Sequence, residues 1–476
     1  MIRIALAAPI FFGALLLAAA PAAAQNQQEA LDARYDRALA AGYKALMLCG
    51  AISSAEANGA VRTPESVMAW ELTGIQTPQA SVIAELPFTI IRSPDGPIAR
   101  VAVSWAQDMP ARIAIYSGPS MGCALAPIGS EDSLDDSRPP VAVPPRAEPK
   151  VLGTMTFKGK VDPDWEPELS PVDRVFKAAI AGGYGEGTRT TVVMINHPRD
   201  SKGKIGSARF APGFDNKTPQ RTWSVAKSIA ATLIGAAVYR GEADVNASAR
   251  LGLADNDPRR AITIDHLLRM ASGRYSDTPG NRTDPLYYGG ATVDEVALDW
   301  PLVSPPGTTF RYANNDTLAA VAAIKGTFAA HPPAELFAKL GMKGTVAETD
   351  WRGDYILSSQ VWATADDLAK LGQLYLNDGK LSSGKRILPE GWVKYVTTPS
   401  GPQPTTGTFG YGAGFWLLNK EEGVPPDTFA AIGNRGQYVV IVPSRKVVIV
   451  RRGEDPAGSG FDIAAFTRDV LKALAE

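Results

Sequence analysis

Histidine and cysteine are scarce in this chain of 476 residues, which has three of the first and two of the second. The histidines, His197, His266 and His331, show no metal-ligand spacing with one another. We therefore expect no metal site and no cofactor. Any catalytic group in this protein must be sought among other residue types.

An excess of either charge is also missing. The chain carries 48 lysines and arginines against 49 aspartates and glutamates, which leaves a net charge of −1. Binding to nucleic acid or to an anionic membrane surface relies on a concentration of positive charge. We therefore expect no nucleic-acid partner, and a small molecule is the more plausible ligand.

Beyond the first residues, no run is long and apolar enough to cross a membrane. Arg3 is followed by an apolar stretch, and Ala22, Ala23 and Ala24 precede Gln25. This order is typical of a secretory signal peptide with a small-residue cleavage site. We predict a signal peptide over residues 1–24, a periplasmic or secreted protein, and no stable membrane span after cleavage.

The two cysteines, Cys49 and Cys123, have two interpretations. In an exported chain they can form one disulfide. The bond would close a long loop and contribute about 4 kcal/mol in the chain-entropy model. Two buried free thiols are the alternative.

The chain divides at a proline-rich stretch over residues 138–150, which is typical of a semi-rigid linker. We predict an accessory domain of unknown role over 25–137, with a helix over 29–56 and strands within 86–116. The second domain, 151–476, begins with a predicted helix over 170–181 and strands over 190–196 and 204–210. It ends with strands over 438–442 and 447–451 and a helix from 462 to 475. Strands at both ends with helices between them indicate an α+β domain.

The candidate for chemistry is a serine–lysine pair, Ser224 and Lys227, at the start of the apolar run 229–234. Residues i and i+3 share one face of a helix, so the amine can approach the hydroxyl. A lysine with a lowered pKa can take the proton of a serine and make it a nucleophile. The alternative for Ser224 is a plain helix N-cap.

The Ser-x-x-Lys pattern occurs twice more, at Ser201/Lys204 and Ser382/Lys385. Both copies lie in short, polar, glycine-bearing stretches, which are typical of turns. Only the copy at Ser224 opens a long apolar helix, so it is the one that we select.

Two later motifs strengthen the selection. Tyr312 and Asn314 form a Tyr-x-Asn pattern in a turn-rich stretch, and residues 433–437 (Gly-Asn-Arg-Gly-Gln) precede a strand-like run. A second Tyr-x-Asn, at Tyr375, lies on an amphipathic helix, so we expect that tyrosine in the core.

The order of these three motifs resembles the serine β-lactamase and DD-peptidase superfamily. The likeness extends from about residue 165 to the C-terminus and is greatest to class C β-lactamases, related esterases and 6-aminohexanoate-dimer hydrolases. It implies an antiparallel sheet flanked by helices, an inserted all-helical lobe, and an active site between them. The small N-terminal α+β domain lies outside the likeness.

The resemblance also implies roles for single residues. Ser224 would attack a carbonyl carbon and form an acyl-enzyme, while Lys227 and Tyr312 move the proton to the leaving group. Asn314 would bind Lys227 or a substrate amide. The backbone N–H groups of Ser224 and Gln437 would form the oxyanion hole.

The third motif departs from the Lys-Thr-Gly of the superfamily, in which lysine and threonine help to bind a carboxylate. Asn434 and Arg435 occupy their positions, and only Gly436 is kept. Arg435 can replace them as a carboxylate fork or lie on the surface. We therefore expect a small amide or ester substrate, or a cell-wall peptide, and Asn434, Arg435 and Gly436 are candidate binding residues.

Alternative interpretations remain open. Residues 118–122 match a nucleophile elbow around Ser120, although a helix is not expected after it. A non-catalytic penicillin-binding or peptidoglycan-sensing module on the same fold is the rival function. Within residues 280–300, Tyr287, Tyr288 and Trp300 are candidates for lining the cleft.

Overall fold

The computed structural model describes residues 19–94, 96–131, 169–196, 207–275 and 283–475. The predicted proline-rich linker lies outside these residues. So do the first eighteen residues of the predicted signal peptide, the Ser201/Lys204 pair and the start of the strand predicted over 204–210.

Helices and strands both recur along the whole of the described chain. In chain order, the helices are α1 (Ala19–Ala57), α2 (Pro64–Trp70), α3 (Gln79–Val82), α4 (Pro171–Ile180), α5 (Val225–Tyr239), α6 (Ile264–Leu268), α7 (Asn314–Ala323), α8 (Pro333–Leu340), α9 (Ala365–Leu376), α10 (Trp392–Thr397) and α11 (Ile463–Ala473). Short 3₁₀ or π turns are η1 (Ile83–Glu85), η2 (Pro258–Ala261), η3 (Pro285–Gly289), η4 (Asp294–Leu298), η5 (Lys325–Ala329) and η6 (Pro443–Arg445). The strands are β1 (Phe88–Arg92), β2 (Ile98–Val103), β3 (Arg112–Tyr116), β4 (Cys123–Leu125), β5 (Thr190–Asn196), β6 (Ala208–Phe210), β7 (Gln220–Arg221), β8 (Val346–Ala347), β9 (Val361–Ala363), β10 (Gly410–Tyr411), β11 (Trp416–Leu417), β12 (Phe429–Gly433), β13 (Gln437–Val442) and β14 (Val447–Gly453).

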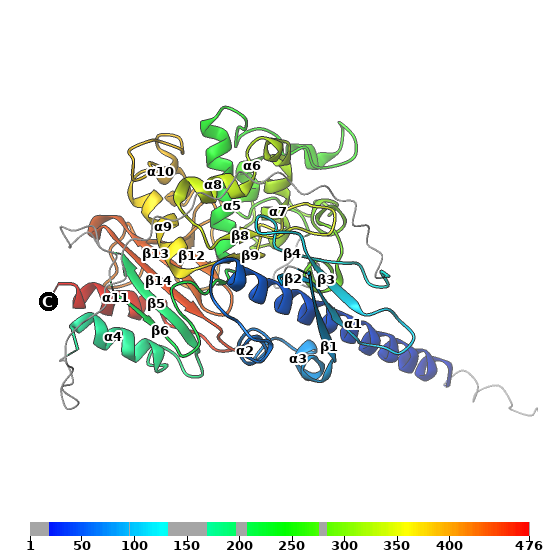
Figure 1. The fold of residues 1–476 in the computed structure, drawn as a ribbon. Helices are drawn as coiled ribbons and strands as arrows, with labels where there is room; N and C mark the ends of the chain where they lie inside the picture. The colour runs from blue at the N-terminus through cyan, green and yellow to red at the C-terminus, as the bar shows by residue number, and fades with distance from the viewer. Residues whose placement is uncertain (1–18, 95, 132–168, 197–206, 276–282, 476) are drawn as a thin grey trace, which may run out of the picture.

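The main sheet joins distant parts of the chain. Its strand order is β10-β11-β12-β13-β14-β5-β6, and every neighbouring pair is antiparallel. β5 and β6 precede the helical segment and the other five strands follow it, so the predicted α+β fold with strands from both ends is confirmed. Figure 1 shows helices on both sides of this sheet.

The two faces of the sheet are set by the alternation of its apolar side chains. Val439, Ile441 and Val448 share one core with α5 and α9. Val440 and Ile449 lie in another core, with α4 and α11. Because both faces are covered, the central strands are apolar throughout.

Local signals account for the flanking helices. Ser170 caps α4 by accepting a hydrogen bond from the Asp173 N–H, and Pro171 takes the first helical position. Asp462 caps α11 in the same way. The predicted helices over 170–181 and 462–475 are confirmed to within a few residues.

The segment between β6 and β10 is mainly helical and has α5 at its centre. Thirteen of the fifteen residues of α5 are buried, including Lys227 and Ser228. Within the same segment, β7, β8 and β9 form a small sheet of order β7-β9-β8. Through this sheet, β7, which lies just before Ser224 in the chain, pairs with β9.

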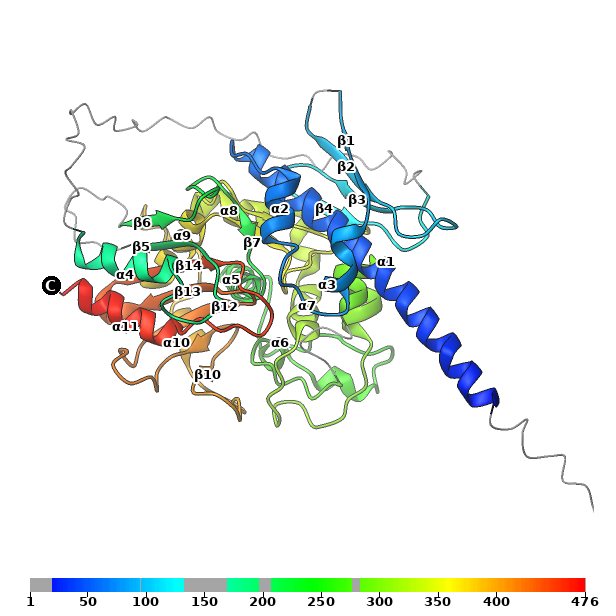
Figure 2. The ribbon, with the colours of Figure 1, turned by 90° about the horizontal axis from the view of Figure 1, so that it is seen from below.

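The N-terminal region consists of α1–α3 and the antiparallel sheet β1-β2-β3-β4. The strands β1, β2 and β3 confirm the prediction of strands within 86–116, and α1 extends the predicted helix at both ends. Figures 1 and 2 show this sheet beside α1, whose first turns project away from the rest of the molecule.

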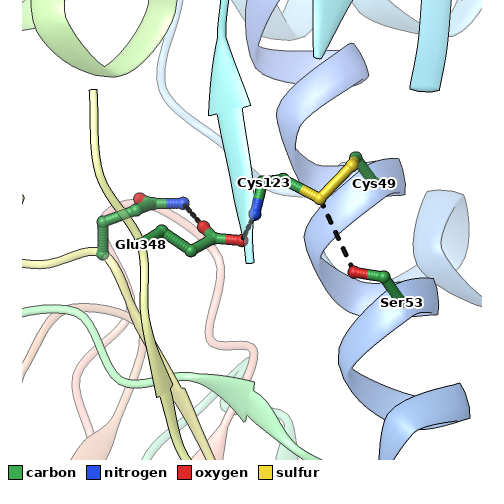
Figure 3. Close-up of a disulfide and its surroundings, with 5 residues drawn as sticks. Cys49, Ser53, Cys123 and Glu348 are labelled. Atoms are coloured by element: carbon green, nitrogen blue, oxygen red, sulfur yellow. Dashed lines mark hydrogen bonds between the residues drawn. A yellow bond between two sulfur atoms is a disulfide. The ribbon is translucent and has the colours of Figure 1, made fainter. Parts of the chain in front are cut away.

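A disulfide joins α1 to β4. The sulfurs of Cys49 and Cys123 are bonded, and the hydroxyl of Ser53 lies 3.5 Å from the Cys123 sulfur. Figure 3 shows that Glu348 reaches the same strand from the opposite side. Its carboxylate accepts hydrogen bonds from the Cys123 N–H (2.9 Å) and from the side chain of Gln360 (2.7 Å). Burial raises the pKa of Glu348 to about 7.

One hydrophobic core includes both the N-terminal region and residues of the later part of the chain. Tyr43, Leu46 and Met47 of α1 share it with Tyr288 and Trp362. The division into two domains stays a prediction, and this core shows how the two parts meet. Removing the N-terminal region would expose a large apolar surface.

One helix among the described residues has the length and hydropathy of a membrane span, over Gln25–Ala57. The apolar window of this helix is wholly buried inside the protein. This corrects the expectation that no apolar run after the predicted signal peptide would be long enough to cross a membrane. The apolar residues of this helix therefore pack into the core of the protein.

Candidate active site

Ser224 lies at the N-cap position of α5 but does not cap it, since its side chain makes no capping hydrogen bond. The hydroxyl faces Lys227 instead. The preceding residue, Trp223, has a φ of 50°, in a region that a bulky side chain rarely adopts. Such strain often occurs where a side chain must be held in place for function.

Lys227 has three oxygen atoms around its amine. The Nζ atom lies 3.2 Å from Oγ of Ser224, 2.6 Å from Oδ1 of Asn314 and 2.9 Å from the carbonyl oxygen of Ser358. The Asn314 amide donates to the Thr283 hydroxyl, which leaves its oxygen pointing at the lysine. Burial lowers the pKa of Lys227 to about 7.

Lys227 donates to all three oxygens, which uses the three N–H groups of a protonated amine. When the amine loses a proton, two N–H groups can still serve Asn314 and Ser358, and the lone pair can accept a hydrogen bond from the Ser224 hydroxyl. In this state Lys227 can accept the serine proton as the hydroxyl attacks a carbonyl carbon.

Tyr312 completes the group around Ser224. Residue 313 is extended, so Tyr312 and Asn314 point to the same side of the chain as it enters α7. Burial raises the pKa of Tyr312 to about 12, although hydrogen bonds with Ser224 and Trp416 oppose the change. Its phenol therefore keeps its proton at neutral pH and can pass it on. The ring centre of Tyr312 lies 5.2 Å from the Lys227 amine.

The turn between β12 and β13 brings the third motif against Ser224. A Cβ atom added at Gly433 would lie 2.4 Å from the Thr222 carbonyl oxygen and 3.0 Å from the Ser224 nitrogen. Gly436 has a φ of 78°, and a Cβ there would fall 1.5 Å from the Arg451 side chain. Only glycine fits these two positions.

Arg435 is not available to a substrate carboxylate, which corrects that expectation. Its Nη2 donates to the carbonyl oxygens of Trp70 (2.9 Å) and Thr73 (2.7 Å), and its Nη1 donates to that of Glu71 (3.2 Å). Its Nε lies 3.0 Å from the carboxylate of Glu454. The side chain is 4% exposed. The alternative of a surface arginine is equally wrong, because the guanidinium is buried against the N-terminal region.

Asn434 and Gln437, which flank Arg435 in the third motif, differ from it in exposure and in hydrogen-bond partners. Asn434 is exposed at the pocket and accepts a hydrogen bond from the Arg435 N–H. Gln437 is buried, and its side chain binds the carbonyl oxygens of Arg435 and Gly453. The side chain of Gln437 therefore braces the turn. The role of its N–H in an oxyanion hole stays a prediction.

A pocket of about 450 Å³ opens beside Ser224. Tyr312, Asn314 and Trp416 line it on one side, and the loop 455–461 after β14 on another. Tyr287 and Tyr288 line it as well, whereas Trp300 is not among its lining residues. Gln76 contributes from the N-terminal region.

The competing motifs lie elsewhere. Ser382 and Lys385 are exposed in a turn, and Tyr375 is a buried core residue of α9 whose hydroxyl lies 2.8 Å from that of Thr232. Ser120 lies on the turn between β3 and β4, and a strand rather than a helix follows it. The nucleophile-elbow interpretation therefore does not hold.

Several site residues carry no signal in the sequence. Ser358 acts through its carbonyl oxygen, which every residue possesses, and Thr283 acts by orienting Asn314. Gln76 lies in a region without recognisable motifs. Their roles arise from contacts between residues far apart along the chain.

The Beta-lactamase family model matches residues 180–469, more than half of the chain. The chain belongs to this family, and its fold is that of a family of hydrolases. A comparison with curated proteins finds no match.

Many solved structures are similar to the chain, and two of them show the extent of the likeness. A protein assigned as a 6-aminohexanoate-dimer hydrolase from Bacillus anthracis is 22% identical, with a TM-score of 0.51, over 63% of this chain and 81% of its own. A protein assigned as a β-lactamase from Bacteroides dorei is 21% identical, with the same TM-score, over 64% of this chain and 98% of its own. At these identities the likeness concerns the fold.

Proposed function

We propose that the protein is an exported serine hydrolase that cleaves a small amide or ester through an acyl-enzyme at Ser224. The observation that carries the proposal is the buried amine of Lys227, which lies 3.2 Å from the Ser224 hydroxyl and whose pKa is lowered to about 7 by burial. Lys227 accepts the serine proton, and Tyr312 delivers a proton to the leaving group. The N–H groups of Ser224 and Gln437 stabilise the oxyanion.

Ester or amide cleavage is favoured over β-lactam hydrolysis. The third motif lacks lysine and threonine, and the guanidinium of Arg435 is bound to main-chain oxygens and to Glu454. It therefore cannot serve as a fork for a substrate carboxylate. The disulfide Cys49–Cys123 supports export, since such bonds persist in oxidising compartments.

The test is steady-state turnover of p-nitrophenyl acetate, with mass spectrometry to detect an acetyl group on Ser224. We expect Ser224→Ala to abolish both. Ser382→Ala alters the exposed copy of the same motif and serves as the matched control, so it should retain the wild-type rate. Acylation without turnover would favour the penicillin-binding or peptidoglycan-sensing alternative. Turnover that survives Ser224→Ala would exclude the mechanism.

A further inference from the structure

A segment of the N-terminal region, Trp70–Gln76, is bound to one wall of the pocket. Arg435 of the third-motif turn donates to three of its carbonyl oxygens. The N–H of Ala457, in the loop that lines the pocket after β14, donates to the Gly74 carbonyl oxygen at 2.7 Å. The segment is therefore joined to both stretches of chain that form this wall.

The same segment also contacts the helical part of the pocket lining. The side-chain amide of Gln76 donates to the hydroxyl of Tyr288 at 2.6 Å, and both residues line the pocket. Tyr288 belongs to η3 in the helical part of the chain, and its ring packs 4.7 Å from that of Tyr43 in α1. Gln76 and Tyr288 thus form a bridge between the N-terminal region and the helical part.

Packing holds this segment in place. A Cβ atom at Gly74 would lie 2.9 Å from Pro456 in the facing loop. The ring of Trp70 meets Phe214 edge to face at 5.0 Å, and the guanidinium of Arg189 lies 4.2 Å from its centre. A segment fixed from several sides can set the dimensions of a pocket, because moving it would break all of these contacts together.

We propose that the N-terminal region completes the active site and that Gln76 is a specificity-determining residue. The Gln76–Tyr288 bridge closes one end of the pocket and limits the size of the substrate group that lies beside Ser224. The protein therefore prefers esters and amides with short acyl or alcohol groups. This inference rests on the proposed function.

A double-mutant cycle on the full chain tests the bridge. Gln76→Met and Tyr288→Phe each remove the same hydrogen bond at nearly constant volume. The readout is the ratio of kcat/KM for a long ester to that for a short one. It is measured along an acyl series from p-nitrophenyl acetate to octanoate and along an alcohol series of acetate esters. We expect each single variant to raise this ratio at least five-fold in one series, and the double variant to raise it no further. Gln28→Ala, on the exposed part of α1, should leave the ratio unchanged.

The outcomes separate this inference from the proposed function. Active variants whose ratios stay within two-fold of wild type would overturn the inference alone, as would additive effects in the double variant. A wild-type protein that neither turns over esters nor is modified at Ser224 by a fluorophosphonate would overturn the proposed function and this inference with it. If Gln76→Met fails to fold, Gln76→Asn also withdraws the amide from Tyr288 and is judged by the same ratio.

Discussion

Two buried cations lie at or next to the same pocket: Arg435 lines it, and Lys227 contacts its lining residues Ser224 and Asn314. Their surroundings differ in one respect. Lys227 contacts the oxygens of Ser224, Asn314 and Ser358, and no carboxylate among the described residues lies within ion-pair distance of it. Arg435 binds carbonyl oxygens as well, but it also pairs with the carboxylate of Glu454. Without a counter-ion, burial lowers the pKa of the lysine to about 7, as the proposed general base requires. With a counter-ion, the arginine serves to connect parts of the structure.

The largest expected effect is on the rate of ester hydrolysis, and it comes from removing the amine of Lys227, the cation without a carboxylate partner. Lys227→Met should lower kcat/KM for p-nitrophenyl acetate by roughly a thousand-fold, the typical contribution of a general base. Lys385→Ala, in the exposed copy of the motif, is the control and should not change the rate. An unchanged rate in Lys227→Met would contradict the role of Lys227 as the general base.

Removing the guanidinium of Arg435, which is paired with Glu454, should instead lower the unfolding free energy. Arg435→Met leaves the carboxylate of Glu454 buried and unpaired, which should cost about 3 kcal/mol of unfolding free energy. Urea unfolding measures this value. Adding Glu454→Gln should recover part of the loss, because the uncompensated charge is gone. Lys227→Met should cost far less stability, since no carboxylate depends on that amine. Equal losses for the two single variants would contradict the comparison.

The third prediction gives Lys227 the counter-ion that Arg435 has. In the wild type, kcat/KM should rise as the pH increases through about 7, because only the neutral amine accepts the Ser224 proton. Asn314→Asp places a carboxylate on the amine, favours its charged form and raises its pKa. The rising limb of the plot of kcat/KM against pH should move at least about one pH unit to the alkaline side. The rate at pH 7 should fall accordingly.

Asn434→Asp is the matched control for this experiment. It makes the same substitution at an exposed position of the pocket. We expect it to move the limb much less, since solvent screens its charge. If both variants shift the limb equally, the contact between Asn314 and Lys227 is not the cause.

Much of the fold could be predicted from local patterns. The cap at Ser170, the alternation of strands near both ends and the apolar run of α5 depend on residues a few positions apart. The approach of Lys227 to Ser224 followed from their spacing on one helix, whereas the places of Tyr312 and Asn314 were implied by the resemblance to a known family. The function of Arg435 did not, since its sequence neighbours allowed both a substrate contact and a surface position.

The sequence by itself determined which groups are present and which elements carry them, because helix periodicity and capping act within a few residues. Tertiary structure alone decided their chemical state. Ser358, which helps to hold Lys227, is 131 positions away, and Trp70, which binds Arg435, is 365 positions away. Desolvation and counter-ions depend on such neighbours in space. Burial without a counter-ion therefore favours the neutral amine at Lys227, whereas Arg435 with its counter-ion is a structural contact.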